Sequence, residues 1–376
     1  MKFFATTYSG LEDVAASEIS KLLNIEAERD VEKVFFDGSL EDCVKLNYGG
    51  QTVNKVFLML LKDKVEGLSD VETLAQSLDY TWVIERDQSF AVRAERIGVH
   101  SFTSLDIAAA VGKAVIESYK AATGVRLKVD LRQPDVEICA ILRDSELLIS
   151  VNTTGESLHR RYYRAGYHRA ALSPNIANAL VRLSGWKPSQ SLLDPFCGSG
   201  TIPLEAALYG LCVSPGLRRG VLAFEKLKFI DPDVSARCRM ALHKMEKVGE
   251  RLEITGLDIS TNSIAVAQSS LAQSGLGETV KFMVGDVLAL EKFLEHDVDR
   301  VVCNPPFGVR MRLKEPAKFY TEAFTSIRRS CPDATLTTIV SKPTIAVKAM
   351  ETSGYTPISI RKILLGPVAG YVLTAV

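Results

Sequence analysis

From residue 171 to the C-terminus, short apolar segments alternate with segments of helical periodicity. The apolar segments that we interpret as strands lie at residues 191–194, 252–258, 280–286, 300–304, 334–342, 358–365 and 371–376. Residues 201–210 and 260–275, which lie between them, have the spacing of helices, and 211–251 is predicted to be an insertion. Alternating strands and helices indicate a parallel, doubly wound α/β sheet with both faces covered, which binds ligands at the carboxyl ends of its strands.

The first 170 residues show a different pattern, typical of α+β units. Residues 3–8, 33–38 and 54–61 are predicted strands, and 11–23 is a predicted amphipathic helix. A second small unit follows, with a strand at 89–96, a helix at 103–122 that Thr103 or Ser104 caps, and strands at 125–131, 136–144 and 146–154. Asp144 and Ser145 form the expected tight turn between the last two strands.

The composition excludes several classes of protein. Hydrophobic residues make up 47% and charged residues 24%, as in ordinary globular proteins. We find no apolar run long enough for a membrane span and no signal-peptide core near the start. The 7 cysteines include no CxxC pair, which argues against a disulfide framework or a metal site and favours a reducing, cytoplasmic location.

The charge is unevenly distributed along the chain. Residues 1–150 carry 17 Lys and Arg against 25 Asp and Glu, a net charge of −8, and residues 151–376 carry 28 against 20, a net charge of +8. The segment 157–170, SLHRRYYRAGYHRA, concentrates arginine, histidine and tyrosine. The whole chain therefore lacks the basic excess of many nucleic-acid-binding proteins, although this segment is locally basic.

The first predicted strand of the α/β region ends in the loop DPFCGSGT, residues 194–201. Gly198 and Gly200 allow a tight turn and a close approach of the backbone to a ligand. The loop has neither GK[ST] nor the third glycine of GxGxxG, and Asp194 would repel a pyrophosphate. An acid beside a glycine turn suits a ligand with an ammonium group, such as the methionyl end of S-adenosylmethionine. The alternative is an ordinary strand–turn–helix connection.

Two further acids follow the next two predicted strands. Asp258 is placed to accept both hydroxyl groups of a ribose, although it also suits the helix N-terminus near Ser260. Asp286 is placed to accept a hydrogen bond from an adenine amino group, with the backbone N–H of Val287 directed at the ring, although Gly-Asp is also a common turn. Three acids at three successive strand ends are difficult to explain by chance.

The fourth predicted strand ends in Asn304, Pro305, Pro306 and Phe307. The prolines lack N–H groups and fix the direction of the backbone carbonyls. The side-chain oxygen of Asn304 and the carbonyl oxygen of Pro305 can hold a planar amino group as its nitrogen becomes tetrahedral, while Phe307 stacks on the base. The alternative is a rigid turn with a buried phenylalanine.

These motifs resemble those of class I S-adenosylmethionine-dependent methyltransferases of the amino-group type, with the pattern (D/N/S)PP(Y/F/W). The loop DPFCGSGT and residues 89–115 and 147–186 resemble the RNA methylases with a THUMP domain, in particular the tRNA guanine-N2 methyltransferases of the TrmN type, which act at position 6 of the acceptor stem. The resemblance covers nearly the whole chain. It implies an N-terminal ferredoxin-like domain (1–64), a THUMP RNA-binding domain (65–155), a linker (156–170) and a Rossmann-like methyltransferase domain with a seven-stranded doubly wound sheet (171–376).

The resemblance also implies roles for particular residues. Asn304, Pro305, Pro306 and Phe307 match the catalytic motif. The expected contacts of S-adenosylmethionine, the implied cofactor, are Ser173, Pro174, Asn175, Asp194, Phe196, Cys197, Gly198, Ser199, Gly200, Thr201, Asp258, Ile259, Asp286, Val287 and Asn304. The motif does not separate guanine from adenine. A ribosomal RNA guanine, another tRNA position and an adenine-N6 therefore remain alternatives, as do a non-catalytic RNA-binding protein and a Rossmann oxidoreductase.

The expected partner is RNA, most simply tRNA, bound by a monomer. Local basic patches suffice for this, because only the contact face must be basic. The predicted RNA contacts are Arg93, Arg96, His100, Arg160, Arg161, Arg164, Arg310 and Arg312. The alternative for each of them is a solvated surface charge.

Overall fold

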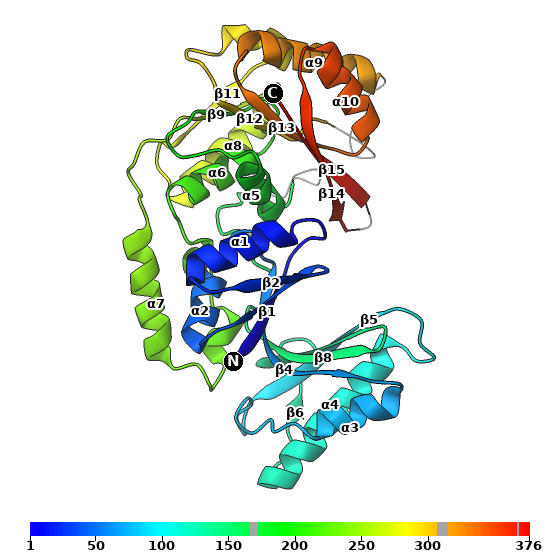
Figure 1. The fold of residues 1–376 in the computed structure, drawn as a ribbon. Coiled ribbons are helices and arrows are strands. Elements are labelled where there is room, and N and C mark those ends of the chain that lie inside the picture. Colours follow the sequence, from blue (N-terminus) through cyan, green and yellow to red (C-terminus); the bar gives the residue numbers. More distant parts are fainter. Residues whose placement is uncertain (166–171, 307–314, 367) are drawn as a thin grey trace.

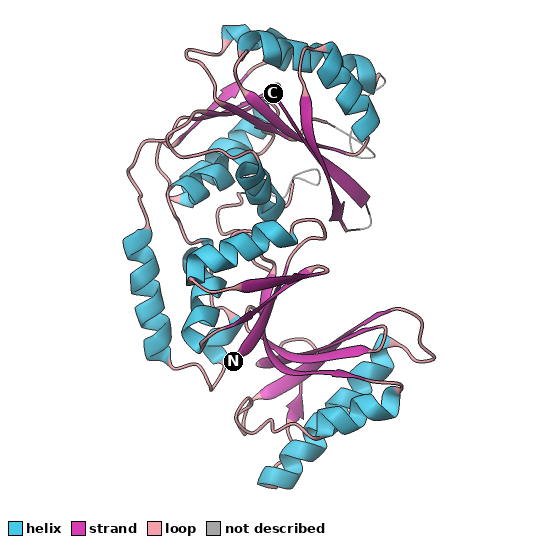
Figure 2. Cartoon of the chain, in the orientation of Figure 1, coloured by secondary structure: helices cyan, strands magenta, loops and turns pink. Residues whose placement is uncertain are grey.

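The computed structural model describes residues 1–165, 172–306, 315–366 and 368–376. Its chain forms two sheets, one in the N-terminal half and one in the C-terminal half (Figure 1). The first has eight strands in the order β2-β3-β1-β4-β8-β7-β5-β6. The second has seven strands in the order β11-β10-β9-β12-β13-β15-β14. Figure 2 shows that helices accompany both sheets.

The N-terminal unit has the order β-α-β-β-α-β of a ferredoxin-like fold. Its elements are β1 (Lys2–Thr6), α1 (Glu12–Leu23), β2 (Ala27–Asp30), β3 (Lys33–Asp37), α2 (Leu40–Gly49) and β4 (Lys55–Lys64). Strand β1 pairs antiparallel with both β3 and β4. Helices α1 and α2 bury apolar side chains such as Ile19 and Val44 in the same core as Phe3 of β1.

The second unit continues the same sheet, because β4 pairs antiparallel with β8. Its elements are α3 (Leu68–Gln76), β5 (Ser89–Ile97), α4 (Ser104–Thr123), β6 (Lys128–Val129), β7 (Val136–Arg143) and β8 (Glu146–Asn152). The N-cap of α4 is Thr103, which forms a capping box with Asp106. Thr103 was one of the two residues predicted to cap this helix. The strand predicted at 125–131 is reduced to the two residues of β6, since only they pair with β5.

The C-terminal domain confirms the predicted doubly wound sheet. Its strands are β9 (Leu192–Asp194), β10 (Ile254–Asp258), β11 (Val280–Val284), β12 (Arg300–Cys303), β13 (Thr335–Val340), β14 (Pro357–Leu365) and β15 (Val368–Ala375). The sheet departs from the all-parallel prediction at one strand, because β15 runs antiparallel to both β13 and β14. Only residues 366–367 join β14 to β15, which is too short for the crossover that a parallel pair needs.

Helices cover both faces of this sheet. The described helices of the domain are α5 (Pro174–Leu183), α6 (Thr201–Gly210), α7 (Pro232–Met245), α8 (Thr261–Ser274), α9 (Pro316–Ser330) and α10 (Pro343–Thr352), with 3₁₀ turns at Pro215–Arg218, Ala223–Lys226 and Val287–Lys292. Helices α5 and α6 share one apolar core with Leu192 of β9. Helices α9 and α10 share another with Leu193. The alternating side chains of β9 therefore face two separate cores.

The predicted insertion leaves its own domain and packs on the N-terminal unit. Helix α7 lies beside α2 (Figure 1). Leu217, Phe224 and Leu242 of this insertion are buried in the N-terminal core, where the Phe224 ring meets Tyr48 of α2 edge-on at 5.1 Å. The N-terminal unit, the second unit and the insertion of the C-terminal domain are therefore joined by apolar packing as well as by the linker.

No described helix has the length and apolar character that a membrane crossing requires. The seven cysteines are free thiols. Within the described ranges, no three His, Cys, Asp or Glu side chains come together as a metal site.

Candidate active site at the carboxyl ends of the strands

Asp194 is the last residue of β9 and is almost completely buried. Its Oδ1 accepts a hydrogen bond of 3.0 Å from the backbone N–H of Phe196, which orders the start of the loop. Burial raises the pKa of the Asp194 carboxyl well above its ordinary value, and the nearby charge of Asp258 acts in the same direction. A ligand cation beside this carboxylate would offset the cost of its ionisation.

The loop after Asp194 is a tight turn built on glycine. Gly198 has φ 52° and Gly200 has φ 80°, and both values favour glycine. A Cβ atom on Gly200 would lie 2.6 Å from Cζ of Phe282 and 3.0 Å from Cβ of Ala267. The loop therefore lies against β11 and α8, and glycine is needed there both for conformation and for space.

Asp258, at the end of β10, holds this loop in place. Its Oδ2 accepts a 2.9 Å hydrogen bond from the N–H of Gly198, and its Oδ1 accepts one of 2.9 Å from the N–H of Ser260. Ser260 in turn caps α8 by accepting a bond from Ser263 N. The next residue, Ile259, exposes 71% of its surface and leaves an apolar side chain available beside the acid. The bond to Gly198 joins two predicted cofactor segments and was not foreseen from the sequence.

Asp286 follows β11 and begins the 3₁₀ turn that contains Val287. Its Oδ1 accepts a 2.9 Å hydrogen bond from Leu288 N. The preceding residue, Gly285, donates its N–H to the carbonyl oxygen of Asp258 at 3.0 Å. The ends of β9, β10 and β11 are thus linked by hydrogen bonds, and all three predicted acids lie along one edge of the sheet.

Asn304 follows β12, which is the neighbour of β9 on its other side. Its side-chain oxygen is buried and has no hydrogen-bond partner among the described residues. A buried polar atom without a partner costs about 1–3 kcal/mol. The hydroxyl of Tyr320 donates to the carbonyl oxygen of Pro306 at 3.2 Å and supports the turn. Phe307 lies outside the described residues. The free acceptor at Asn304 fits a donor brought by a ligand or substrate.

This edge of the sheet fits S-adenosylmethionine. The glycine turn permits close approach of the backbone, Asp194 suits an ammonium group, and Asp258 retains acceptor capacity for a hydroxyl. Cys197, Ser199 and Thr201 belong to the same turn and helix start, and Cys197 N donates to Leu257 O at 2.9 Å. The residues at this edge would hold the cofactor, which supplies an electrophilic methyl group on a sulfonium.

Two of the three predicted cofactor contacts at the start of α5 bond to the N-terminal unit. Ser173 accepts a 2.9 Å hydrogen bond from the hydroxyl of Tyr8. Asn175 donates its amide to Val53 O at 2.6 Å and to Asn54 Oδ1 at 3.0 Å, while its own Oδ1 is buried without a partner in the described part of the chain. Pro174 is the first residue of α5. Ser173 and Asn175 thus join two domains, and the contact of all three residues with the cofactor remains a prediction.

Arg161 does not have the surface position that RNA contact requires, and its prediction as an RNA ligand was wrong. Its side chain is fully buried and forms two hydrogen bonds with Glu205, at 2.8 and 3.0 Å. It also donates to the carbonyl oxygens of Leu158 and Gln51 at 2.7 Å. All of its charge and most of its N–H groups are therefore used inside the protein.

The other predicted RNA contacts differ in their availability. Arg160 is exposed and pairs with Glu156. Arg164 donates to Leu172 O, and Arg93 bonds to Glu137 and to Leu131 O. His100 Nε2 lies 2.6 Å from Asp144 O, so this nitrogen carries a proton that it donates. The set also includes Arg96, which is partly exposed, and Arg310 and Arg312, which lie outside the described residues.

The sheet order and the acids at its carboxyl edge define a class I S-adenosylmethionine-dependent methyltransferase, an enzyme. Residues 161–365 match the family model described as RMKL-like, methyltransferase domain, 66–152 match the THUMP domain, and 2–57 match the RlmL ferredoxin-like domain. The chain belongs to the RMKL-like methyltransferase family.

Relatives and solved structures agree with this membership. The chain is 36% identical to the tRNA (guanine(6)-N2)-methyltransferase of Archaeoglobus fulgidus over 94% of this chain and 86% of the relative. It is 34% identical to the enzyme of the same name from Methanocaldococcus jannaschii over 87% and 86%. TrmN from Thermus thermophilus, at 26% identity, superposes with a TM-score of 0.74 over 100% and 98% of the two chains. SMU.472 in complex with SAH shares the fold at a TM-score of 0.89 and 22% identity, over 99% and 97%.

Proposed function

We propose that this enzyme transfers a methyl group from S-adenosylmethionine to the exocyclic N2 amino group of a guanosine in tRNA, at position 6. The observation that carries the proposal is the buried side-chain oxygen of Asn304, which has no partner within the described part of the chain and lies at the edge of the predicted cofactor residues. An amino group presents two hydrogens, one for this oxygen and one for the carbonyl of Pro305. The relatives named tRNA (guanine(6)-N2)-methyltransferase favour guanine over adenine.

The residues of the site act by position rather than as strong bases. Asn304 and the Pro305 carbonyl orient the amino group, so that its nitrogen lone pair is directed at the methyl carbon. On accepting the methyl group that the bound cofactor would supply, the nitrogen would become positively charged, and the two oxygen acceptors would stabilise that charge. The nitrogen then loses one proton to solvent. The amide of Asn304 stays neutral throughout.

The RNA partner and setting follow from the same proposal. The match to a THUMP domain at 66–152 supports RNA as the substrate. The seven free thiols fit the reducing conditions of the cytoplasm, where we expect a monomer to act on tRNA.

The proposal is tested by incubating the protein with labelled cofactor and, separately, total tRNA and total ribosomal RNA. Mass spectrometry of digested nucleosides should find N2-methylguanosine in tRNA, and a transcript with the guanosine at position 6 replaced should not be labelled. Label in N6-methyladenosine or only in ribosomal RNA would contradict it.

A further inference from the structure

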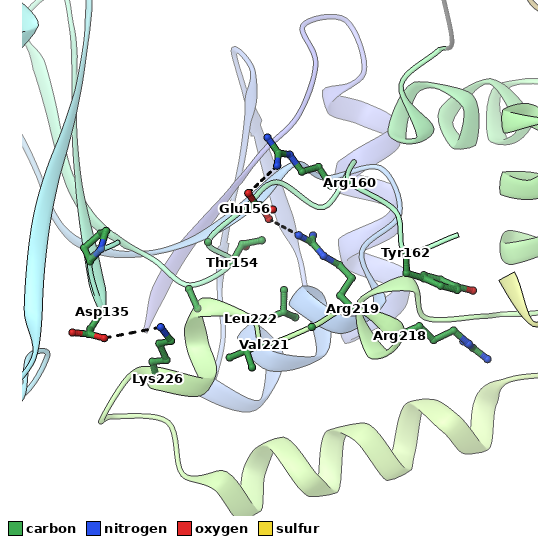
Figure 3. Close-up of a pocket in the computed structure, with 14 residues that line it drawn as sticks. Asp135, Thr154, Glu156, Arg160, Tyr162, Arg218, Arg219, Val221, Leu222 and Lys226 are labelled. Carbon is green, nitrogen blue, oxygen red and sulfur yellow. Dashed lines mark hydrogen bonds and ion pairs between the residues drawn. The ribbon is translucent and has the colours of Figure 1, made fainter. Parts of the chain in front are cut away.

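A cavity lies where the THUMP domain, the linker and the insertion meet, and it shares no residue with the active site. Its volume is ≈ 510 Å³. Its walls come from the residues before β7, from 154–162 and from 218–226 (Figure 3). We call it the junction cavity. All of its lining residues belong to the described part of the chain.

The lining of the junction cavity carries more positive than negative side chains. Its charged residues are Arg160, Arg218, Arg219, Lys226, Asp135 and Glu156. Arg218 is neutralised by two 2.8 Å hydrogen bonds with Glu246, and Figure 3 shows it pointing away from Lys226. Lys226 lies 4.0 Å from Asp135, and Arg160 pairs with Glu156 in an exposed ion pair. Such exposed or distant pairs are weak and leave both cations available to a ligand.

Arg219 also lines the cavity, and among the described residues its guanidinium bonds only to backbone oxygens. Its guanidinium donates to Ser157 O at 3.1 Å and to Glu156 O at 3.2 Å, both of them neutral carbonyl oxygens. Burial lowers the pKa of Arg219; the charge of Glu156 opposes this, and the charges of Arg161 and Arg160 lower the pKa further. The pKa of the neighbouring His159 is lowered by burial and then by four arginines. An anion in the junction cavity would relieve this repulsion.

The chemistry of the cavity favours a phosphodiester as that anion. Guanidinium and ammonium groups bind phosphate oxygens well, and the exposed apolar side chain of Val221 can lie against a sugar. A volume of ≈ 510 Å³ exceeds the needs of a single inorganic ion. The cavity also lies between the THUMP domain and a segment of the methyltransferase domain, which an RNA bound to both would cross.

We propose that the junction cavity binds a backbone phosphate of the RNA substrate through Arg219, Arg160 and Lys226. This inference rests on the proposed function for its ligand. It assigns an RNA contact to the insertion 211–251, which otherwise serves only to pack on the N-terminal unit.

The test measures the Kd of an unmodified tRNA transcript by fluorescence anisotropy at several salt concentrations. Lys226→Glu, Arg160→Glu and Arg219→Glu should each weaken binding about tenfold at low salt and reduce the slope of log Kd against log salt by about one. Arg237→Glu is the matched control, because Arg237 is an exposed arginine of the same insertion outside the cavity. It should change neither quantity.

Glu156→Gln should change the RNA affinity in the opposite direction, and a folding defect cannot produce such a gain. Glu156 is exposed and bonds through its carboxylate only to Arg160 among the described residues, so its loss should free that arginine and tighten binding several-fold. If all three charge reversals match Arg237→Glu, or if Glu156→Gln weakens binding, the cavity is not a phosphate site.

The experiment distinguishes an error in the proposed phosphate site from an error in the proposed function. If tRNA guanosine is methylated normally and the slope of log Kd against log salt is unchanged in the variants, only the phosphate site in the cavity is overturned. The predicted changes in RNA binding without any methyl transfer to guanosine would support the cavity and overturn the proposed activity.

Discussion

At the scale of single residues, the acids predicted to bind the cofactor already have structural roles in the fold. Asp258 was predicted to bind a ribose or to stabilise a helix start, and in the structure it accepts bonds from the N–H groups of Gly198 and Ser260. Asp286 both follows β11 and begins a 3₁₀ turn. The structural and the functional interpretations were therefore not exclusive, because a carboxylate can accept about four hydrogen bonds.

Asn304→Ala should lower kcat about 100- to 1000-fold, since it removes one of two acceptors of the amino group. Cofactor affinity measured by calorimetry should stay nearly unchanged. Asn304→Asp keeps an oxygen at the same place and should retain part of the activity. Normal turnover of Asn304→Ala would exclude this residue from the reaction.

Asp194→Asn should stabilise the cofactor-free protein at neutral pH and weaken cofactor binding. The pKa of Asp194 is raised in the folded state. The folded protein therefore loses stability as the pH rises from the pKa of the unfolded state through the raised pKa of the folded state. The gain of the variant in Tm should therefore be present above the raised pKa and vanish below about pH 3.8. An equal Tm difference at all pH values would contradict a burial effect.

At the scale of elements, most strands were predictable and several helices were not. The strands of the C-terminal domain are short apolar runs, and their order places the acids on one edge. Helix α2 was missed, although Ser39 and Asp42 form a capping box that marks its start. Helix α3 was also missed, because only Val71 and Ala75 are buried in it and its apolar pattern is short.

Gly200→Ala should reduce cofactor affinity more than tenfold, because the added Cβ meets Phe282 and the positive φ is strained. Gly277→Ala is the matched control: Gly277 has a φ of +66°, and no atom of the described residues lies within 4 Å of the added Cβ. Both variants carry the backbone strain, and only the first moves the loop. Equal cofactor affinities in a titration would show that the contact with Phe282 does not matter.

At the scale of the whole molecule, the three domains are joined by buried polar contacts as well as apolar ones. Arg161 of the linker pairs with Glu205 of α6, whose carboxylate also accepts a bond from the Tyr163 hydroxyl. Arg182 of α5 pairs with Glu18 of α1, which accepts bonds from Gln51 N and Thr52 N. These contacts connect the N-terminal unit to the linker and the methyltransferase domain.

Arg161→Ala should cost about 3–5 kcal/mol of stability, because it leaves the buried carboxylate of Glu205 without its charged partner. Arg160→Ala, one residue away, removes an exposed arginine and should change stability by less than about 1 kcal/mol. Denaturant unfolding of the two variants measures the difference. Similar small losses in both would contradict the buried pair.

The sequence by itself determined the chemistry of this protein. Strand-length apolar runs, a glycine turn, three acids and NPPF are local features, and local sequence determines which residue follows which strand. Only the tertiary structure decided which charges face solvent. Arg160 and Arg161 are neighbours of one type, yet 64% of one side chain is exposed and 0% of the other. Burial depends on segments far away in the chain, here Gln51 and Glu205, and no local pattern contains them.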